Sequence, residues 1–253
     1  MKNKLIIGAR GSKLSLAYAH KVRKLILMKN KVKLNVLIKS IKTKGDKIQN
    51  KKISEIGGKN LFCKEIENQL IKKKIDIAVH SLKDMDSFEN KKLLVGAYLK
   101  RNDPRDVLIM QRGTKTINLS NKTIGSSSKR RELQLKLINK NVRIKNIRGN
   151  IDTRVKKIIN RSFDGALLAY AGIKVLKFKK YVNKVFSVKQ IIPSVGQGII
   201  AAQCRKKDVF TINLLKEINH NETKTCALAE KFFLKTIGGD CHTAAGGLAK
   251  IRN

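Results

Sequence analysis

The stretch Ile75-Asp-Ile-Ala-Val-His-Ser-Leu-Lys-Asp84 decides the fold of this chain. Its first half, residues 75–79, is rich in isoleucine and valine, which is typical of a strand buried in an α/β sheet. Its second half turns polar and places Lys83 beside Asp84. Ligands of open α/β sheets bind outside the carboxyl ends of the strands, so this pair indicates a reactive site. The stretch alone leaves open a plainer interpretation, a surface turn with two solvated charges.

Strand-like and helix-like segments alternate around this stretch, which predicts an α/β fold with parallel or mixed sheets. We expect the segment 199–204 to be a strand that returns to the first domain. The expected strands are 5–10, 34–41, 75–79, 93–99, 107–110, a strand that ends at Gly125, 142–147, 166–169 and 199–204. The expected helices are 14–28, one opening at 61, one running to about 137, then 153–159, 211–218 and 222–235.

The composition is strongly basic. The 253 residues carry a formal net charge of +39, yet 42% of them are hydrophobic, so the chain can bury a core. Such a charge is typical of nucleic-acid or anionic-membrane partners. Here the lysines are spread over nearly every segment, and aromatic stacking platforms and recognised motifs are missing. We therefore expect neither nucleic acid nor a membrane as a partner of this chain. The net positive charge alone does not indicate a function.

The cysteines and the N-terminus bear on the cellular compartment. The four cysteines form no C-x-x-C pair and have no histidine at zinc-finger spacing, so no metal site is expected. No apolar signal core follows Met1, and no apolar run approaches the ~18 residues that span a bilayer. The sequence predicts a soluble, cytoplasmic protein with reduced thiols.

Arginines and hydroxyl groups follow several of the expected strands. Arg10-Gly-Ser12 ends the first strand, and Gly125-Ser-Ser-Ser-Lys-Arg-Arg131 leads from a strand into a helix. Cations in the first turn of a helix oppose its dipole, so Arg130 and Arg131 need a compensating anion. We expect the strand ends after residues 10, 125 and 147 to bring arginine to the same edge of one sheet, as a ligand with several carboxylates requires.

Nine motifs resemble, in order, those of the hydroxymethylbilane synthase (porphobilinogen deaminase) family. They span essentially the whole chain and include the opening stretch from Asp76 to Asp84. The other eight are Gly8-Ala-Arg-Gly-Ser12, Thr43-Lys-Gly-Asp46, Ile56-Gly-Gly-Lys-Asn-Leu-Phe62, Asn102-Asp-Pro-Arg-Asp106, Gly125-Ser-Ser-Ser-Lys-Arg-Arg131, Ile147-Arg-Gly-Asn150 with Arg154, Pro193-Ser-Val-Gly-Gln-Gly198 and Gly239-Asp-Cys-His-Thr243.

The resemblance implies an α/β fold of two periplasmic-binding-protein-like (type II) domains with mixed sheets, plus a small α+β C-terminal domain that is shortened here. Domain 1 is expected to be discontinuous, at residues 1–98 and 195–215. Domain 2 is expected at 99–194, and domain 3, which carries the cofactor cysteine, at 216–253. A monomer is implied as well.

The resemblance also implies the reaction. Four porphobilinogen units are condensed head to tail, with loss of ammonia, onto a covalent dipyrromethane primer, and the linear tetrapyrrole hydroxymethylbilane is released. By position, the dipyrromethane cofactor is attached through Cys241, whose thiolate is a competent nucleophile. Asp84 is implied to be the catalytic carboxylate, which stabilises the cation formed by ammonia loss.

The polypyrrole chain bears many carboxylates, so the resemblance implies a set of cationic and hydroxyl binding residues around it. The partners are porphobilinogen and the growing polypyrrole chain. The implied binding residues are Arg10, Ser12, Lys59, Lys83, Ser126, Ser127, Ser128, Arg130, Arg131, Arg148, Arg154, Gly172 and Gln197.

Some positions depart from the family pattern. Asp86 adds a negative charge near Asp84, Val175 stands where an arginine is usual, and Glu55 where some members have lysine. The family's usual C-terminal domain also continues further, so we expect exposed apolar surface there. These departures keep open an alternative, a decayed, non-catalytic, carboxylate-binding α/β protein.

Overall fold

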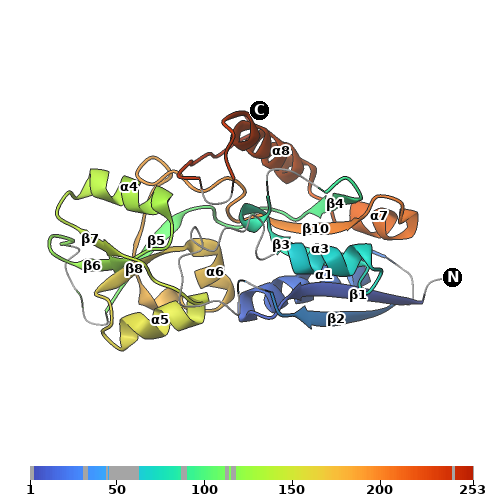
Figure 1. Cartoon of the computed structure of the whole chain (residues 1–253), viewed down its shortest axis with the longest axis horizontal. Coiled ribbons are helices and arrows are strands. Elements are labelled where there is room, and N and C mark those ends of the chain that lie inside the picture. The colour runs from blue at the N-terminus through green and yellow to red at the C-terminus, as the bar shows by residue number, and fades with distance from the viewer. Residues whose placement is uncertain are drawn as a thin grey trace. The chain divides into compact units, whose positions relative to one another are not determined.

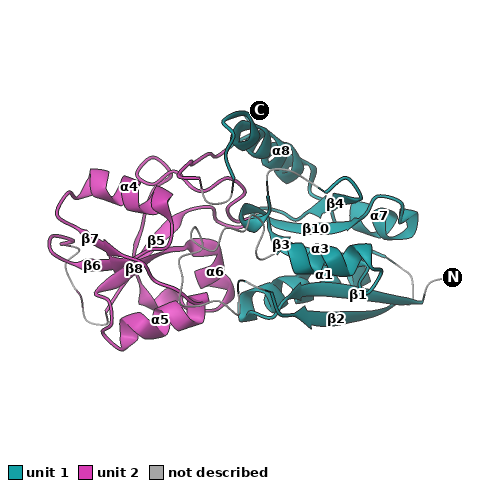
Figure 2. Ribbon diagram, in the orientation of Figure 1, with its two compact units in different colours: residues 1–101, 199–241, 249–253 teal, residues 102–198, 242–248 magenta. Residues whose placement is uncertain are grey.

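The computed structural model describes residues 3–30, 34–43, 45, 63–86, 90–111, 114, 118–240 and 243–252. The chain divides into two compact units (Figure 2). Unit 1 comprises Met1–Arg101, Ile199–Cys241 and Ala249–Asn253; unit 2 comprises Asn102–Gly198 and His242–Leu248. Within the described residues, no helix has the length and apolar character needed to cross a membrane.

A mixed five-stranded sheet forms the centre of unit 1 (Figure 1). β1 pairs in parallel with β2 and β3, whereas β10 runs antiparallel to both β3 and β4. The chain therefore returns to the first sheet after completing the second. In sheet order, the strands are β2 (Asn35–Ile41), β1 (Lys4–Arg10), β3 (Ile77–Ser81), β10 (Ile200–Arg205) and β4 (Leu93–Tyr98).

Helices cover both faces of this sheet. The connection from β1 to β2 runs through α1 (Lys13–Lys29), and the connection from β2 back to β3 runs through α3 (Lys64–Ile71). Right-handed crossovers in opposite directions place α1 and α3 on opposite faces. α3 packs its Ile66 and Leu70 against Ala78 of β3. Two further α-helices of unit 1 that the structure describes, α7 (Val209–Lys216) and α8 (Asn221–Thr236), lie against β4.

The last helix of unit 1, α8, buries charge and exposes apolar side chains. Glu230 and Lys231 are buried, while Phe232 is 72% exposed and Phe233 44% exposed. Glu230 is held by Arg101, with N–O distances of 2.5 and 3.2 Å, and also accepts a hydrogen bond from the Ala249 backbone at 2.9 Å. A paired carboxylate therefore fixes this helix to the segment that follows β4, and apolar surface is exposed on α8, in the C-terminal region where it was expected.

Unit 2 repeats the strand arrangement of unit 1. β6 pairs in parallel with β7 and β8, and β5 runs antiparallel to β8 and β9. In sheet order, the strands are β7 (Arg143–Lys145), β6 (Thr123–Gly125), β8 (Gly165–Ala169), β5 (Asp106–Met110) and β9 (Val182–Val185). Because β5 is antiparallel, its first residue, Asp106, pairs with Ala169 and lies at the edge where the parallel strands end.

The alternation of side chains along β5 builds two cores on the two faces of this sheet. Leu108 and Met110 pack in one cluster with Leu135 of α4 (Lys129–Ile138). Val107 and Ile109 pack in the other, with Val155 and Ile158 of α5 (Ile151–Ile159) and Ile173 of α6 (Tyr170–Val175). In Figure 1, α4 and α5 accordingly lie on opposite sides of the sheet.

The expectation that three arginine-bearing strand ends share one sheet is wrong. β1, which ends at Arg10, belongs to the sheet of unit 1, whereas β6 and β7 belong to that of unit 2. Similar strand-end patterns in the sequence gave no information on which sheet each strand joins. The sequence patterns also did not indicate α6, β9 or the short 3₁₀ helix η3 (Lys179–Tyr181). The proposed third domain remains a prediction; its residues 216–253 are shared between the two units.

Candidate active site

The candidate catalytic carboxylate, Asp84, ends a short 3₁₀ helix, η2 (Leu82–Asp84), that follows β3 directly. The Leu82 backbone donates to Ile199 at 3.0 Å, and the Cys63 thiol donates to the Asp84 carbonyl oxygen at 3.4 Å. Leu82 and Met85 are buried on either side of the half-buried Asp84. The backbone is thus anchored, while the carboxylate makes no hydrogen bond or ion pair to any residue that the structure describes.

Two other predicted site residues lie at the same edge of the sheet. β1 and β3 run in parallel, with Ala9 opposite Val79, so the strand ends carrying Arg10 and Lys83 lie side by side. Both side chains are half-buried. Arg10 and Lys83 suit the carboxylates of a ligand. Asp84, whose carboxylate has no partner among the described residues, suits the N–H groups of the same ligand.

The hydroxyl of Ser12 serves the fold of this edge. Ser12 is the N-cap of α1: its Oγ accepts from the Ser15 backbone at 3.2 Å and donates to the Ser15 hydroxyl at 2.9 Å. This satisfies one of the free N–H groups at the helix start. A role of Ser12 in ligand binding remains a prediction.

His80, the other ionisable group of the opening stretch, is a core residue. It is 5% exposed and shares the β3–β10 region with Gln203, whose amide donates to Glu67 at 2.9 Å. Burial, with a smaller contribution from the charge of Lys231, lowers the pKa of His80 to about 4. The imidazole is therefore neutral at pH 7.

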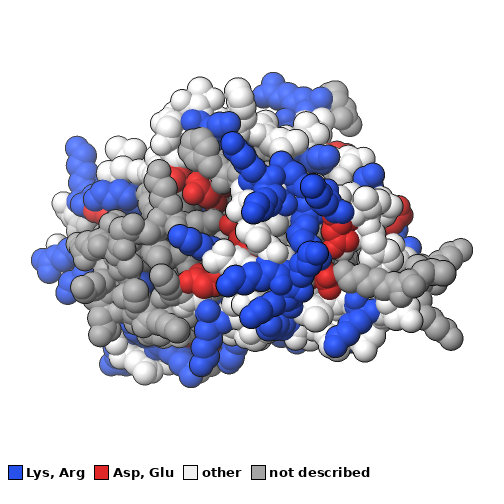
Figure 3. Space-filling view, turned by 45° about the vertical axis from the view of Figure 1, so that its right-hand side comes forward, with Lys and Arg blue, Asp and Glu red and all other residues white. Residues whose placement is uncertain are grey.

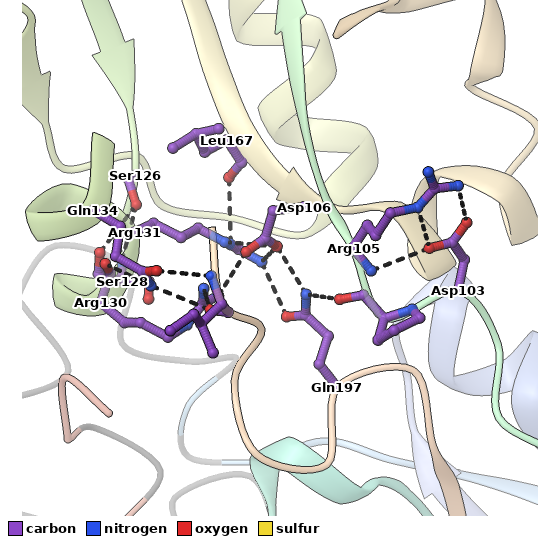
Figure 4. Close-up of polar contacts among 12 residues, drawn as sticks. Asp103, Arg105, Asp106, Ser126, Ser128, Arg130, Arg131, Gln134, Leu167 and Gln197 are labelled. Carbon is purple, nitrogen blue, oxygen red and sulfur yellow. Dashed lines mark hydrogen bonds and ion pairs between the residues drawn. The ribbon is translucent and has the colours of Figure 1, made fainter. Parts of the chain in front are cut away.

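A buried ionic cluster lies at the corresponding edge of unit 2 (Figure 4). Asp106, fully buried, accepts from Arg130 Nη2 at 2.8 Å and from Arg131 Nη2 and Nε at 2.8 and 3.1 Å. Gln197 donates to the same carboxylate at 2.8 Å and to the Pro104 carbonyl at 2.7 Å. We call these four side chains the Asp106 cluster: Asp106, Arg130, Arg131 and Gln197.

The electrostatics of this cluster keep all three charges. Burial alone raises the pKa of Asp106, but attraction and hydrogen bonds from Arg131 and Arg130 outweigh it and lower that pKa to about 2. Burial also lowers the pKa of Arg130, against the attraction of Asp106. A guanidinium titrates so far above neutrality that Arg130 stays protonated.

The Asp106 cluster supplies the anion that the two arginines require. Arg130 and Arg131 lie in the first turn of α4, where the helix dipole disfavours cations. Their compensating anion is a residue of the chain itself. Arg130 keeps a buried Nε that contacts no hydrogen-bond partner in the described structure. Their roles toward a bound carboxylate remain predictions.

The three serines before α4 also bond within the protein. Ser126 donates to the Ser128 carbonyl at 3.2 Å and accepts from the Ser128 backbone at 3.1 Å. Ser127 donates to the Ile147 carbonyl. These bonds fix the turn between β6 and α4, and the predicted ligand contacts of the three hydroxyls stay predictions.

Of the remaining predicted residues of unit 2, one lies just before α5, one within α5 and one within α6. Arg154 donates through Nε to the Gly149 carbonyl at 2.8 Å, and the Arg148 carbonyl accepts from Lys157 at 3.3 Å. Both arginines are half-buried. Gly172 lies buried inside α6.

Lys174 precedes Val175, one of the positions that depart from the family pattern, and its contacts are described. Lys174 lies 3.5 Å from Asp103 and 4.7 Å from the ring centre of Tyr170. The Asp103 carboxylate also pairs with Arg105 at 2.7 Å. Hydrogen bonds from Arg105 hold the pKa of Asp103 below its usual value.

Two predicted residues, Lys59 and Cys241, lie outside the described residues, as does Glu55. The approach to Cys241 is described up to residue 240. There Gly238 has a φ of +66°, and no atom lies within 4 Å of where its Cβ would stand. Glycine reaches this left-handed conformation without strain, so the chain turns sharply after α8.

Sequence reasoning missed Asp106 as the central anion of unit 2. The signal was present: Asn102-Asp-Pro-Arg-Asp106 supplies carboxylates, and Arg130 and Arg131 lacked an anion. The sequence did not reveal that β5 pairs with β8. In the folded structure Asp106, the first residue of β5, contacts Arg130, which lies more than 20 positions away in the sequence.

The fold defines the class of protein. The structure is similar to a double mutant of the VFT2 domain of BvgS from Bordetella pertussis, with a TM-score of 0.51, 11% identity and coverage of 92% of this chain and 91% of that one. It is similarly related to a substrate-binding domain of a putative amino acid ABC transporter from Streptococcus pneumoniae, with a TM-score of 0.50, 10% identity and coverage of 92% and 94%. The chain is an α/β protein of the periplasmic-binding-protein type.

The sequence comparisons place the chain within one family. Residues 5–213 match the model "Porphobilinogen deaminase, dipyromethane cofactor binding domain". The chain is 40% identical to porphobilinogen deaminase from Alkaliphilus metalliredigens over 95% of its length and 76% of the relative's. It is 41% identical to the Ehrlichia chaffeensis protein of that name, with coverage of 98% and 83%. The chain belongs to the porphobilinogen deaminase family, as the nine motifs indicated.

Proposed function

We propose that this chain is a transferase, a hydroxymethylbilane synthase that condenses four porphobilinogen units, releasing ammonia at each step, and then frees the linear tetrapyrrole. The observation that carries this proposal is the family match over residues 5–213, extended by relatives that align with nearly all of the chain. Porphobilinogen carries an acetate, a propionate and an aminomethyl group on a pyrrole ring. The two carboxylates require one kind of residue, and the reacting aminomethyl group requires another.

Asp84 is the catalytic carboxylate. When the bond between the aminomethyl carbon and its nitrogen breaks, ammonia leaves with the bonding pair and a cation remains on the pyrrole. A carboxylate beside the pyrrole N–H stabilises that cation and accepts a proton. The absence of a side-chain partner for Asp84 among the described residues and its half-buried place at a sheet edge support this role.

The acetate and propionate groups require cations. In unit 1, Arg10 and Lys83 flank the sheet edge that carries Asp84. In unit 2, Arg148 and Arg154 are half-buried. The resemblance to the family assigns the binding of these carboxylates to Arg10, Lys83, Arg148 and Arg154. The two arginines of the Asp106 cluster pair with Asp106 and hold the β6–α4 turn in place.

The residues present fit a covalent dipyrromethane. Such a group carries carboxylates, and in unit 2 the buried Nε of Arg130, which has no hydrogen-bond partner among the described residues, is a donor for one of them. Cys241 holds it through a thioether. When bound, the dipyrromethane supplies the primer on which the chain is built. The glycines before Cys241, with Gly238 in a left-handed conformation, permit the attachment segment to turn away from α8.

The competing functions have less support. A decayed carboxylate-binding protein would not need Asp84, yet the strand end, the 3₁₀ turn and the carboxylate are all in place. A nucleic-acid binder is suggested by charge alone. On the face drawn in Figure 3, lysine and arginine side chains cover more of the surface than acidic ones, but acidic groups lie among them.

Product formation tests the proposal. Purified protein incubated with porphobilinogen is expected to release ammonia and a linear tetrapyrrole, and Ehrlich's reagent is expected to colour the protein before substrate is added. Colourless protein that releases no ammonia would favour the decayed binder. Retention on DNA at low salt without any pyrrole would favour the nucleic-acid binder.

We also propose that the enzyme works as a monomer in the cytoplasm, without a membrane or nucleic acid as partner. The support is the resemblance to the family. Light scattering on the purified protein is expected to give the mass of one chain of 28.5 kDa. A mass of two chains or more would contradict the monomer.

A further inference from the structure

One tyrosine of unit 1 occupies an unusual place beside the candidate catalytic carboxylate. Tyr18 lies in α1 and is 6% exposed. With Ala19, Val22 and Ile26 it forms the face of the helix that is buried against the sheet. Of these four side chains, Tyr18 is the first along the helix and the one with a polar atom.

The topology of unit 1 determines where this side chain points. α1 begins just after β1 ends and runs back along the sheet, so its first turns lie at the carboxyl edge. Tyr18 is only six residues from the N-cap Ser12, roughly 9 Å along the axis. Helical side chains lean toward the helix N-terminus, which aims the phenol of Tyr18 at the edge that carries Asp84.

The electrostatics of Tyr18 agree with this placement. Burial raises the pKa of Tyr18 to about 12, and the charge of Asp84 contributes to the shift. The phenol is therefore an uncharged hydrogen-bond donor at any physiological pH. No hydrogen bond joins its hydroxyl to another residue in the described part of the chain, and the carboxylate of Asp84 likewise has no described partner.

We propose that Tyr18 is a further substrate-contacting residue, whose hydroxyl donates a hydrogen bond to the pyrrole substrate held against Asp84. A neutral donor suits this place, because a further cation would pair with Asp84 and remove the charge that the reaction needs. An acetate or propionate oxygen of the substrate is the acceptor that the phenol can reach from the strand edge. This proposal rests on the proposed function of the chain.

Substitution of Tyr18 by phenylalanine removes the hydroxyl and keeps the buried ring. We expect Tyr18→Phe to retain its covalent pyrrole and melting temperature, while kcat/KM for porphobilinogen falls about tenfold, the effect of one lost hydrogen bond of ~1.4 kcal/mol. Tyr181→Phe is the matched control, since Tyr181 is a partly buried tyrosine that packs against a core cluster of unit 2. A Tyr18→Phe enzyme with kcat/KM within twofold of the unchanged protein overturns the proposal.

A spectroscopic measurement separates this proposal from the proposed function. In protein labelled with 3-fluorotyrosine, the ¹⁹F signal of Tyr18 is identified by its loss in Tyr18→Phe. We expect this signal to move in Asp84→Asn and again when porphobilinogen is added, while the Tyr181 signal stays in place. A Tyr18 signal that ignores both changes overturns the Tyr18 proposal even if the enzyme is active. Wild-type protein that makes no tetrapyrrole, but whose Tyr18 signal responds to Asp84→Asn and porphobilinogen, overturns the proposed reaction and supports the Tyr18 contact.

Discussion

Asp84 and Asp106 occupy the same kind of position in two sheets of the same design, yet their surroundings are opposite. Each lies at the edge where three parallel strands end. Asp84 is half-buried and has no side-chain partner among the described residues. Asp106 is fully buried and bonded to Arg130, Arg131 and Gln197. One carboxylate is available for chemistry, and the other is used by the fold.

The difference shows how to interpret arginines that follow strands. A buried carboxylate costs several kcal/mol unless cations and hydrogen bonds compensate it, so Asp106 requires both arginines. An arginine at a strand end can thus bind a ligand or neutralise a neighbour, and only its partner distinguishes the two. Asp84, by contrast, is half-buried at the sheet edge, where a ligand can reach it.

The largest expected effect follows the removal of the available carboxylate. Asp84→Ala is expected to lower kcat by roughly 10²–10⁴-fold, the usual contribution of an acid–base group, with little change in melting temperature. Steady-state kinetics on purified protein measure it, and Asp86→Asn is the matched control with near-normal turnover. Near-normal turnover of the Asp84→Ala variant would show that Asp84 is not the catalytic carboxylate.

Removal of the buried charge is expected to affect folding. Asp106→Asn leaves two buried guanidinium groups without their anion, which costs about 3–5 kcal/mol of unfolding free energy. For a chain of this size the melting temperature falls by about 10 °C or more. Thermal unfolding is the measurement, with Asp103→Asn, which carries a partly exposed pair, as the control. Equal stability of the two variants would show that the Asp106 cluster contributes little.

The pH dependence of stability sharpens the same comparison. The folded pKa of Asp106 is about 2, below its ordinary value of 3.8, so its charge stabilises the folded state above about pH 4. This stabilisation, about 2 kcal/mol, is lost as the pH falls from about 4 toward 2. Denaturant titrations at several pH values are expected to show a steeper acid loss in the unchanged protein than in Asp106→Asn. Parallel curves would contradict the assignment.

The smallest expected effect concerns Gln197, which the sequence assigned to ligand binding. Gln197→Ala removes the hydrogen bonds to Asp106 and to the Pro104 carbonyl, and it is expected to cost about 1–2 kcal/mol of stability. The KM for porphobilinogen should change little. If KM rises severalfold while stability is unchanged, Gln197 contacts the ligand after all.

The sequence predicted the fold well where patterns are local. Short apolar runs located the strands, and Gly-Ser turns marked the helix starts, because both signals depend on neighbouring residues. The position of Asp84 just after a buried strand could be derived in the same way. The assignment of Arg10 to the same sheet as Arg148 failed, because membership of a sheet depends on pairing between distant segments.

The partners of buried charges also depend on distant segments. Nothing near Arg130 in the sequence indicates that Asp106, 24 residues earlier, is its partner. The place of Tyr18 on the buried face of α1 likewise arises from the crossover that lays this helix over the sheet. Local patterns therefore located the candidate site, and only the folded structure separated the groups that serve the fold from those left for a ligand.

The most direct test of the account is the intact mass of the purified protein. The account predicts that the unchanged chain and Asp84→Ala both carry two covalently attached pyrrole units, that Cys241→Ser carries none, and that only the unchanged chain gains further units and releases product with porphobilinogen. An unchanged chain with the mass of the bare polypeptide, or a Cys241→Ser variant that still carries two pyrroles, would contradict it.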